Sequence, residues 1–275
     1  MASPLISASD LAALLGSVTL LDVRYQTGVP DGRPAYEAGH VPGAAYVDMD
    51  TELAGPPAPP GKPGGRHPLP DTGVFQAAMR RAGVRGDRPV IVYDGWGGRA
   101  ASRAWWLLRH HGHPDVRVLD GGWPAWREAG GAKEQGEVSP EPGDFTADPG
   151  HLPVVDADDV LAVEVLLDAR AQERYAGEHE PIDPVAGHVP GAVCVPTTDN
   201  LDPDGRFKSA DELRRMYAAI GAVPGADVAA YCGSGVTACH DLLALAVARV
   251  PAALYAGSWS DWVSDPERPV AGRPV

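Results

Sequence analysis

The sequence of 275 residues has few cysteines, a deficit of basic residues and no long hydrophobic run. Three cysteines cannot form a fully paired disulfide framework, so we expect thiols in a reducing compartment. The longest apolar runs, such as residues 242–250, are shorter than the roughly 20 residues that cross a bilayer. The first residues do not pair a basic flank with an apolar core, so no signal peptide is expected. We therefore predict a cytoplasmic protein without a membrane partner.

The charge balance and the cysteine spacing exclude further classes. Acidic residues number 37 against 23 basic ones, which gives a net charge of -14. A surface of this sign repels phosphate backbones, so no nucleic-acid partner is predicted. No Cys/His spacing is typical of zinc, and we predict neither a metal nor a cofactor.

What the sequence does contain is an internal repeat. Four stretches of the first half recur in the second half in the same order, and they begin with LLDVR (20–24) and LLDAR (166–170). The other pairs are AGHVPGAAYVD (38–48) with AGHVPGAVCVP (186–196), residues 89–108 with 227–246, and 118–126 with 254–262. We infer two tandem domains, 1–137 and 138–275, with a linker at about 128–153 that is rich in Gly and Pro.

Each half alternates short apolar strands with helices, which predicts an α/β fold. We expect a mostly parallel central sheet flanked by helices in each domain. In such sheets, chemistry takes place at the carboxyl ends of the strands. Asp94 and Cys232 stand at equivalent strand ends in the two halves.

The stretch YCGSGVTACH (231–240) carries the strongest chemical signal. Gly233 and Gly235 allow the backbone to curl, and a helix is expected to start just after them. A loop of this shape collects N–H groups around an anion, and a thiol at a helix N-terminus is activated as a thiolate. Cys232 is therefore predicted to be a nucleophile. A phosphatase is excluded, because position 238 is Ala where an arginine would have to clamp phosphate.

These motifs resemble the two-domain sulfurtransferases of the rhodanese superfamily over nearly the whole chain. The Gly-His-Val-Pro-Gly-Ala motif, the strand at 166–170 and GSWSDW (257–262) fit the family. The loop CGSGVTA is most similar to that of 3-mercaptopyruvate sulfurtransferases. Thiosulfate enzymes typically carry Arg-Lys at the two positions after the cysteine. Asp94 fits the first domain of such enzymes, which lacks the cysteine.

The resemblance implies that a small-molecule donor passes sulfur to Cys232, which becomes a persulfide. An acceptor such as a thiol, cyanide or thioredoxin then takes the outer sulfur. It also implies that the N–H groups of the loop stabilise the sulfur anion and contact the substrate. These groups belong to Gly233, Ser234, Gly235, Val236, Thr237 and Ala238.

The resemblance implies further site residues. A serine, a histidine and an aspartate of the family match Ser234, His67 and Asp50, and we expect a Pro-rich loop at 53–73 to deliver the histidine to the other domain. The substrate-binding arginine matches Arg174. A second family arginine matches Ile182, which is a departure from the family pattern. Another cation, such as Arg99 or His179, would then take its place.

Other residues have structural interpretations. His40 and His188 recur in both halves although only one half has the cysteine, and Arg170 has its counterpart in Arg24, so we expect these residues to support the fold. The tryptophans are expected in the core, Cys194 buried in a strand, and Cys239 packed, with a redox role left open for it. The core tryptophans are Trp105, Trp106, Trp123, Trp126, Trp259 and Trp262.

Two alternative functions remain open. A thiosulfate sulfurtransferase, which would move sulfur from thiosulfate to cyanide, would use the same fold and nucleophile. The loop lacks cations for a dianionic donor, which argues against it, while Ile182 at the second-arginine position argues for it. A persulfide carrier module without a small-molecule donor of its own is the second alternative.

Overall fold

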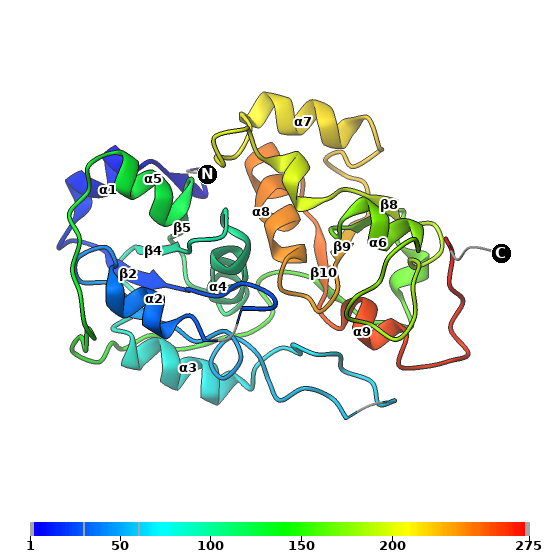
Figure 1. Cartoon of the computed structure of the whole chain (residues 1–275), viewed down its shortest axis with the longest axis horizontal. Coiled ribbons are helices and arrows are strands. Elements are labelled where there is room, and N and C mark those ends of the chain that lie inside the picture. The colour runs from blue at the N-terminus through cyan, green and yellow to red at the C-terminus, as the bar shows by residue number, and fades with distance from the viewer. Residues whose placement is uncertain (1–2, 30, 60, 273–275) are drawn as a thin grey trace. The chain divides into compact units, whose positions relative to one another are not determined.

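The computed structural model describes residues 3–29, 31–59 and 61–272, which form two compact units (Figure 1). The first unit comprises the described residues of Met1–Gly55, Pro70–Leu152 and Pro203–Arg206. The second comprises those of Pro56–Leu69, Pro153–Asp202 and Phe207–Val275. Segment 56–69 therefore belongs to the second unit, although it interrupts the first one in sequence.

The first unit has a five-stranded sheet in the order β1-β5-β4-β2-β3, and all of its described pairings are parallel. The strands are β1 (Leu5–Ile6), β2 (Thr19–Asp22), β3 (Ala45–Tyr46), β4 (Val90–Tyr93) and β5 (Val116–Leu119). The helices are α1 (Ala8–Leu14), α2 (Arg33–Ala38), α3 (Thr72–Arg81), α4 (Arg99–His110) and α5 (Gly122–Glu128).

The second unit repeats this topology, with a parallel sheet in the order β6-β10-β9-β7-β8. Its strands are β6 (Val154–Val155), β7 (Val165–Asp168), β8 (Val193–Cys194), β9 (Val228–Tyr231) and β10 (Ala253–Tyr255). Its helices are α6 (Gln172–Ala176), α7 (Ala210–Ala218), α8 (Ala238–Ala248) and α9 (Ser258–Trp262), with 3-10 turns η1 (Val160–Ala162) and η2 (Thr197–Asn200).

Both sheets are covered on two faces, as the continuous apolar strands require. All four residues of β4 and of β9 are buried, which is typical of a central parallel strand. In the second unit, Tyr231 of β9 packs in one core cluster with Trp259 and Trp262 of α9. Helix α8 contacts β9, β10 and α7, and its apolar run is a buried core helix. The α/β prediction is confirmed.

The segment between α5 and β6 contains neither helix nor strand but is held against the first unit. Phe145 is buried there, and its backbone N–H donates to the carbonyl of Val84 at 3.2 Å. Gly143 donates in the same way to Arg80 at 2.8 Å. This Gly- and Pro-rich stretch is thus fixed by backbone hydrogen bonds and one aromatic anchor.

Candidate active site

Cys232 lies at the carboxyl end of β9, where the chain turns into α8. Its side chain is buried, and the N–H of Gly235 donates to its Sγ at 3.1 Å. Gly235 has φ +81°, and a Cβ there would lie 2.3 Å from the carbonyl oxygen of Ala256. Only glycine satisfies both conditions, so this residue allows the loop to fold around the sulfur.

The corresponding loop of the first unit shows what this backbone can hold. Asp94 takes the place of the cysteine, and its carboxylate accepts four backbone N–H groups at 2.8 to 2.9 Å. The donors are Trp96, Gly98, Ala100 and Ala101. The repeated loop is therefore an anion-binding nest in the first unit. The loop around Cys232 is its counterpart in the internal repeat.

The start of α9 fixes the cysteine loop from the opposite side. The N–H of Cys232 donates to Oγ of Ser258 at 3.1 Å, and Trp259 donates to the carbonyl of Cys232 at 2.9 Å. Ser258 has φ +56°, the same value as its counterpart Gly122 in the first unit. The left-handed conformation costs a non-glycine residue about 1–2 kcal/mol, and here the serine hydroxyl gains a contact to the backbone N–H of Cys232.

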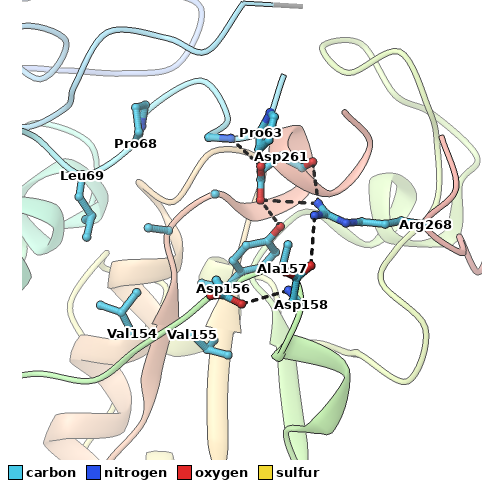
Figure 2. A pocket seen from close by; sticks show the side chains of 14 residues that line it. Pro63, Pro68, Leu69, Val154, Val155, Asp156, Ala157, Asp158, Asp261 and Arg268 are labelled. Carbon is cyan, nitrogen blue, oxygen red and sulfur yellow. Dashed lines mark hydrogen bonds and ion pairs between the residues drawn. The ribbon is translucent and has the colours of Figure 1, made fainter. Parts of the chain in front are cut away.

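The same short helix anchors segment 56–69. The N–H of Arg66 donates to Oγ of Ser260 at 3.1 Å, and Gly64 donates to Oδ1 of Asp261 at 2.6 Å. Figure 2 shows Asp261 beside Arg268 at the rim of a cavity of about 400 Å³, with Pro63, Pro68 and Leu69 of the segment along its wall. One motif, GSWSDW, thus holds both the cysteine loop and the segment that precedes His67.

His67 and Ser234 form the most direct polar contact next to Cys232. Nδ1 of His67 lies 2.8 Å from Oγ of Ser234, within the second unit. The contact joins a residue of segment 56–69 to the cysteine loop. An imidazole can exchange a proton with a hydroxyl at this distance, so the pair has the geometry of a proton relay.

Arg174 occupies an acidic setting. Its Nε and Nη2 donate to Glu180 at 3.0 and 2.8 Å, and Nη2 also contacts Asp183 at 3.0 Å. Burial alone would raise the pKa of Glu180, but hydrogen bonds from Arg174 and from two backbone N–H groups lower it. Burial raises the pKa of Asp183 against the opposing effect of Arg66. The sequence did not indicate that the predicted substrate arginine would be neutralised in this way.

A second arginine, Arg66, covers the cysteine loop and was missed from the sequence. Its Nη2 would lie 3.0 Å from a Cβ on Gly233, and both Nη atoms of Arg174 would lie at 3.5 Å. Arg66 is paired with Asp183. The loop itself contributes no cation, as expected, but guanidinium groups from two other segments lie over it. The one signal for Arg66 in the sequence was its position next to His67.

The remaining predicted site positions are as follows. Asp50 is exposed after β3 in the first unit, and its role stays a prediction. The Ile182 side chain is 44% exposed on the second unit. Arg99 packs over Trp96 in the first unit, 5.6 Å from the ring centroid. His179 is exposed just after α6.

The other two cysteines differ from Cys232. Cys194 is only half-buried, contrary to expectation, because β8 is a two-residue strand at the edge of its sheet. Burial nevertheless raises the pKa of its thiol to about 12. Cys239 is buried in α8, and its Sγ lies 3.5 Å from the carbonyl oxygen of Gly235.

The repeated histidines make matching structural contacts. Nδ1 of His40 lies 3.0 Å from the carbonyl of Tyr36, and Nδ1 of His188 lies 2.8 Å from that of Tyr175. Each imidazole also stacks on the ring of the tyrosine whose carbonyl it contacts. Arg170 and Arg24 likewise each bind the aspartate two residues before them. Of the tryptophans, Trp105, Trp106, Trp126, Trp259 and Trp262 are buried, and Trp123 is partly buried.

Helix α8 also buries a carboxyl group. Oδ1 of Asp241 accepts from Nδ2 of Asn200 at 2.7 Å, and Tyr217 donates to Asn200 at 2.8 Å. Within the described ranges, Oδ2 of Asp241 has no hydrogen-bond partner. Burial raises the pKa of Asp241 well above its usual value, which favours the neutral acid.

Two absences apply to the described part of the chain only. No group of three or more His, Cys, Asp or Glu side chains there could hold a metal ion. Among those same residues, no helix is long and apolar enough to cross a membrane.

A family model described as the rhodanese-like domain matches residues 7–129 and 155–265. The chain belongs to the rhodanese family. The two matched ranges correspond to the two parallel sheets, so both rhodanese domains of the repeat are present.

Similar proteins include sulfurtransferases named for two different donors. A Pseudomonas aeruginosa protein provisionally named 3-mercaptopyruvate sulfurtransferase is 46% identical over 97% of this chain and 97% of its own length. A Mycobacterium tuberculosis protein provisionally named thiosulfate sulfurtransferase SseB is also 46% identical, over 97% and 96%. The crystal structure of SseA from Escherichia coli, a 3-mercaptopyruvate sulfotransferase, matches with a TM-score of 0.82 and 34% identity, over 94% of this rhodanese chain and 100% of SseA.

Proposed function

We propose that this rhodanese-family protein transfers sulfur from 3-mercaptopyruvate to a thiophilic acceptor through a persulfide on Cys232. The observation that carries the proposal is the contact of 2.8 Å between His67 and Ser234 beside the nucleophile loop. A mercapto-oxo acid needs a proton at its departing carbon skeleton, and this pair is a source of one. The relatives named for this donor add support.

The first half-reaction forms one bond and breaks one. The Cys232 thiolate attacks the donor sulfur, and its electron pair forms the S–S bond. The C–S bond breaks, and its electrons pass into the carbonyl group to give the enolate of pyruvate, which then takes up a proton. The sulfur is oxidised and the carbon skeleton is reduced by the same electron pair, so no external oxidant is needed.

Ser234 and His67 have defined roles in this scheme. For the hydroxyl of Ser234 to donate to the developing enolate oxygen, Nδ1 of His67 has to donate its own proton to Oγ. The pair would thereby stabilise negative charge on the leaving group. Asp50 is proposed as a further catalytic residue on the ground of the resemblance to the family.

The loop and its surroundings would stabilise the sulfur anion in both half-reactions. The N–H of Gly235 already donates to Sγ of Cys232. The N–H groups of the rest of the loop are proposed to surround the outer sulfur of the persulfide, as the equivalent groups surround the carboxylate of Asp94. An acceptor thiolate or cyanide then removes the outer sulfur and restores the Cys232 thiolate. We propose a small thiol, cyanide or thioredoxin as acceptor, in the cytoplasm.

One observation favours a second candidate, the thiosulfate sulfurtransferase. Arg66 and Arg174 cover Gly233, the position where the resemblance to thiosulfate enzymes would expect an arginine. Two guanidinium groups suit a dianionic donor. Against it, Asp183 and Glu180 offset the charge of these arginines.

The deciding experiment measures kcat/KM for 3-mercaptopyruvate and for thiosulfate with the same acceptor. A higher value for 3-mercaptopyruvate is expected. A higher value for thiosulfate would overturn the proposal in favour of the second candidate. Turnover of neither donor, with persulfide transfer from a partner protein, would instead identify a carrier module.

A further inference from the structure

The sheet of the second unit has an open edge at β6. This strand is the last in the order β6-β10-β9-β7-β8, and within the described ranges it pairs with β10 alone. Val154 stands opposite Leu254, whose N–H donates to the carbonyl of Pro153 at 3.1 Å. The N–H and C=O of successive residues in a strand face opposite edges, so those of Val154 face away from β10. Val154 is also 44% exposed, so its backbone is open to a further extended chain.

The cavity of about 400 Å³ lies beside this edge (Figure 2). Val154 and Val155 of β6 line it together with Pro68 and Leu69 of segment 56–69. All of its lining residues belong to the second unit. Alternate side chains of an extended segment face the same side, so a segment paired with β6 can place one side chain in this cavity.

The polar lining of the cavity is acidic. Asp156, Asp158 and Asp261 contribute carboxylates, and Arg268 is the one cation among the described lining residues. Arg268 approaches Asp158 and Asp261 at 3.8 Å each, so it offsets only part of their negative charge. Gly64 already donates to Asp261, whereas the side chain of Asp158 is 91% exposed. Complementary charge therefore favours a positively charged side chain as occupant.

The first unit has a smaller cavity, of about 210 Å³, at the corresponding edge of its sheet. Four of its lining positions match residues 156–158 and 256 of the second cavity: Ser7, Ala8, Ser9 and Asp120. Arg206 also lines the first cavity and pairs with Glu128 at 2.9 Å. Arg66, which like Arg206 follows a glycine shortly before a helix, pairs with Asp183 and is not among the described residues that line the second cavity. The chain thus supplies a guanidinium to the less acidic cavity and not, from the equivalent segment, to the more acidic one.

We propose that the second unit binds an extended segment of a partner protein at this edge. The segment pairs with Val154 through its backbone and places a lysine or arginine side chain in the cavity, next to Asp156 and Asp158. Backbone pairing supplies affinity for any extended chain, and the acidic cavity selects a basic residue. Segment 56–69 lines the cavity and includes His67, so the bound partner would lie along the segment that contacts Ser234.

The test measures binding of a labelled, end-blocked pentapeptide, Val-Arg-Val-Arg-Val, to the full chain by fluorescence anisotropy. Val-Glu-Val-Glu-Val is the charge-reversed control, and we expect it to bind at least about 10-fold more weakly. The double variant Asp156→Asn, Asp158→Asn should weaken binding of the arginine peptide about 2- to 25-fold. The amide oxygen at position 156 can still accept the N–H of residue 158, which Asp156 accepts at 3.0 Å. Asp211→Asn is the matched control, because it removes an exposed carboxylate from α7 of the same unit and should leave binding unchanged.

Strand pairing is tested separately from charge. Val154→Pro removes the N–H that faces away from β10, and it should weaken both peptides about 2- to 13-fold. An arginine peptide methylated on its backbone nitrogens tests the same pairing on the unchanged protein and should bind more weakly than the parent peptide.

Three outcomes would overturn the inference. Absence of binding, or equal binding of the arginine and glutamate peptides, would show that the cavity does not select a basic segment. Equal affinities of the Asp156→Asn, Asp158→Asn variant and the Asp211→Asn variant would place the peptide elsewhere on the surface. Unchanged affinity of the methylated peptide would exclude pairing with β6 and reduce the cavity to a site for a basic side chain alone.

Discussion

The contact between His67 and Ser234 leads to a prediction that separates a proton relay from a merely structural hydrogen bond. The perturbation is Ser234→Ala, combined with His67→Ala and the double variant. Oγ of Ser234 lies 2.8 Å from Nδ1 of His67, and Ser234 is 9% exposed. Removing one small hydroxyl leaves the loop backbone intact, so the effect should be on the reaction and not on folding.

The two roles differ in magnitude. A neutral hydrogen bond contributes about 0.5–1.5 kcal/mol, which corresponds to about 2- to 13-fold in rate. Proton transfer by a positioned side chain contributes about 100- to 10,000-fold. Because the distance already suits proton exchange, we expect Ser234→Ala to lower kcat with 3-mercaptopyruvate by about 100-fold or more.

The assay follows pyruvate release at saturating acceptor for the two single variants and the double variant. Residues that act as one unit have non-additive effects, so the double variant should be no slower than the slower single variant. Ser264→Ala is the control, since its hydroxyl donates to the carbonyl of Asp261 away from the loop. A loss below about 13-fold in Ser234→Ala, or losses that multiply in the double variant, would refute the relay.

Three further predictions follow from buried groups. Cys232→Ser should abolish donor turnover, while Cys194→Ser and Cys239→Ser should retain most of it. The Cys194 thiol stays protonated because burial raises its pKa to about 12. Donor turnover by the Cys232 variant would contradict the proposal. Asp94→Asn should lower the free energy of unfolding by about 2–6 kcal/mol in chemical denaturation, because an amide NH2 leaves two of four buried N–H donors unsatisfied; an unchanged midpoint would count against the nest. Burial raises the pKa of Asp241, so the native state binds its proton more tightly than the unfolded state. The contribution of the protonated Asp241 carboxyl to the free energy of unfolding is complete below about pH 4 and is lost as pH rises, by up to about 1.4 kcal/mol per pH unit. Asp241→Asn should therefore flatten the pH dependence of stability. Parallel curves of stability against pH for the variant and the wild type would exclude this role of Asp241.

The cysteine loop could be interpreted from the sequence because its chemistry is local. Cys232, Gly233 and Gly235 are neighbours in the chain, and the strand before them and the helix after them follow from a continuous apolar pattern. The position of Cys194 was misjudged for the opposite reason. Its apolar neighbours indicated burial, but exposure depends on β8 being the edge strand, which pairing order alone decides.

The arginines illustrate the limit of motif transfer. Arg174 was identified by its place in a short motif, yet its partners Glu180 and Asp183 depend on how the following turn folds back. Arg66 lies in a Pro- and Gly-rich stretch without periodicity, and nothing local indicates where its guanidinium lies. A search limited to the positions around Ile182 could not find it.

The sequence by itself determined the duplicated α/β architecture, the choice of Cys232 as the predicted nucleophile and the asymmetry between Asp94 and Cys232, because repeats, strand patterns and glycine-rich turns are properties of contiguous residues. Only the tertiary structure decided that α9 anchors both Cys232 and segment 56–69, and that Arg66 stands over Gly233. These contacts join residues far apart in the chain. They arise from packing of side chains in three dimensions, where a distance of a few ångströms has no counterpart in sequence separation.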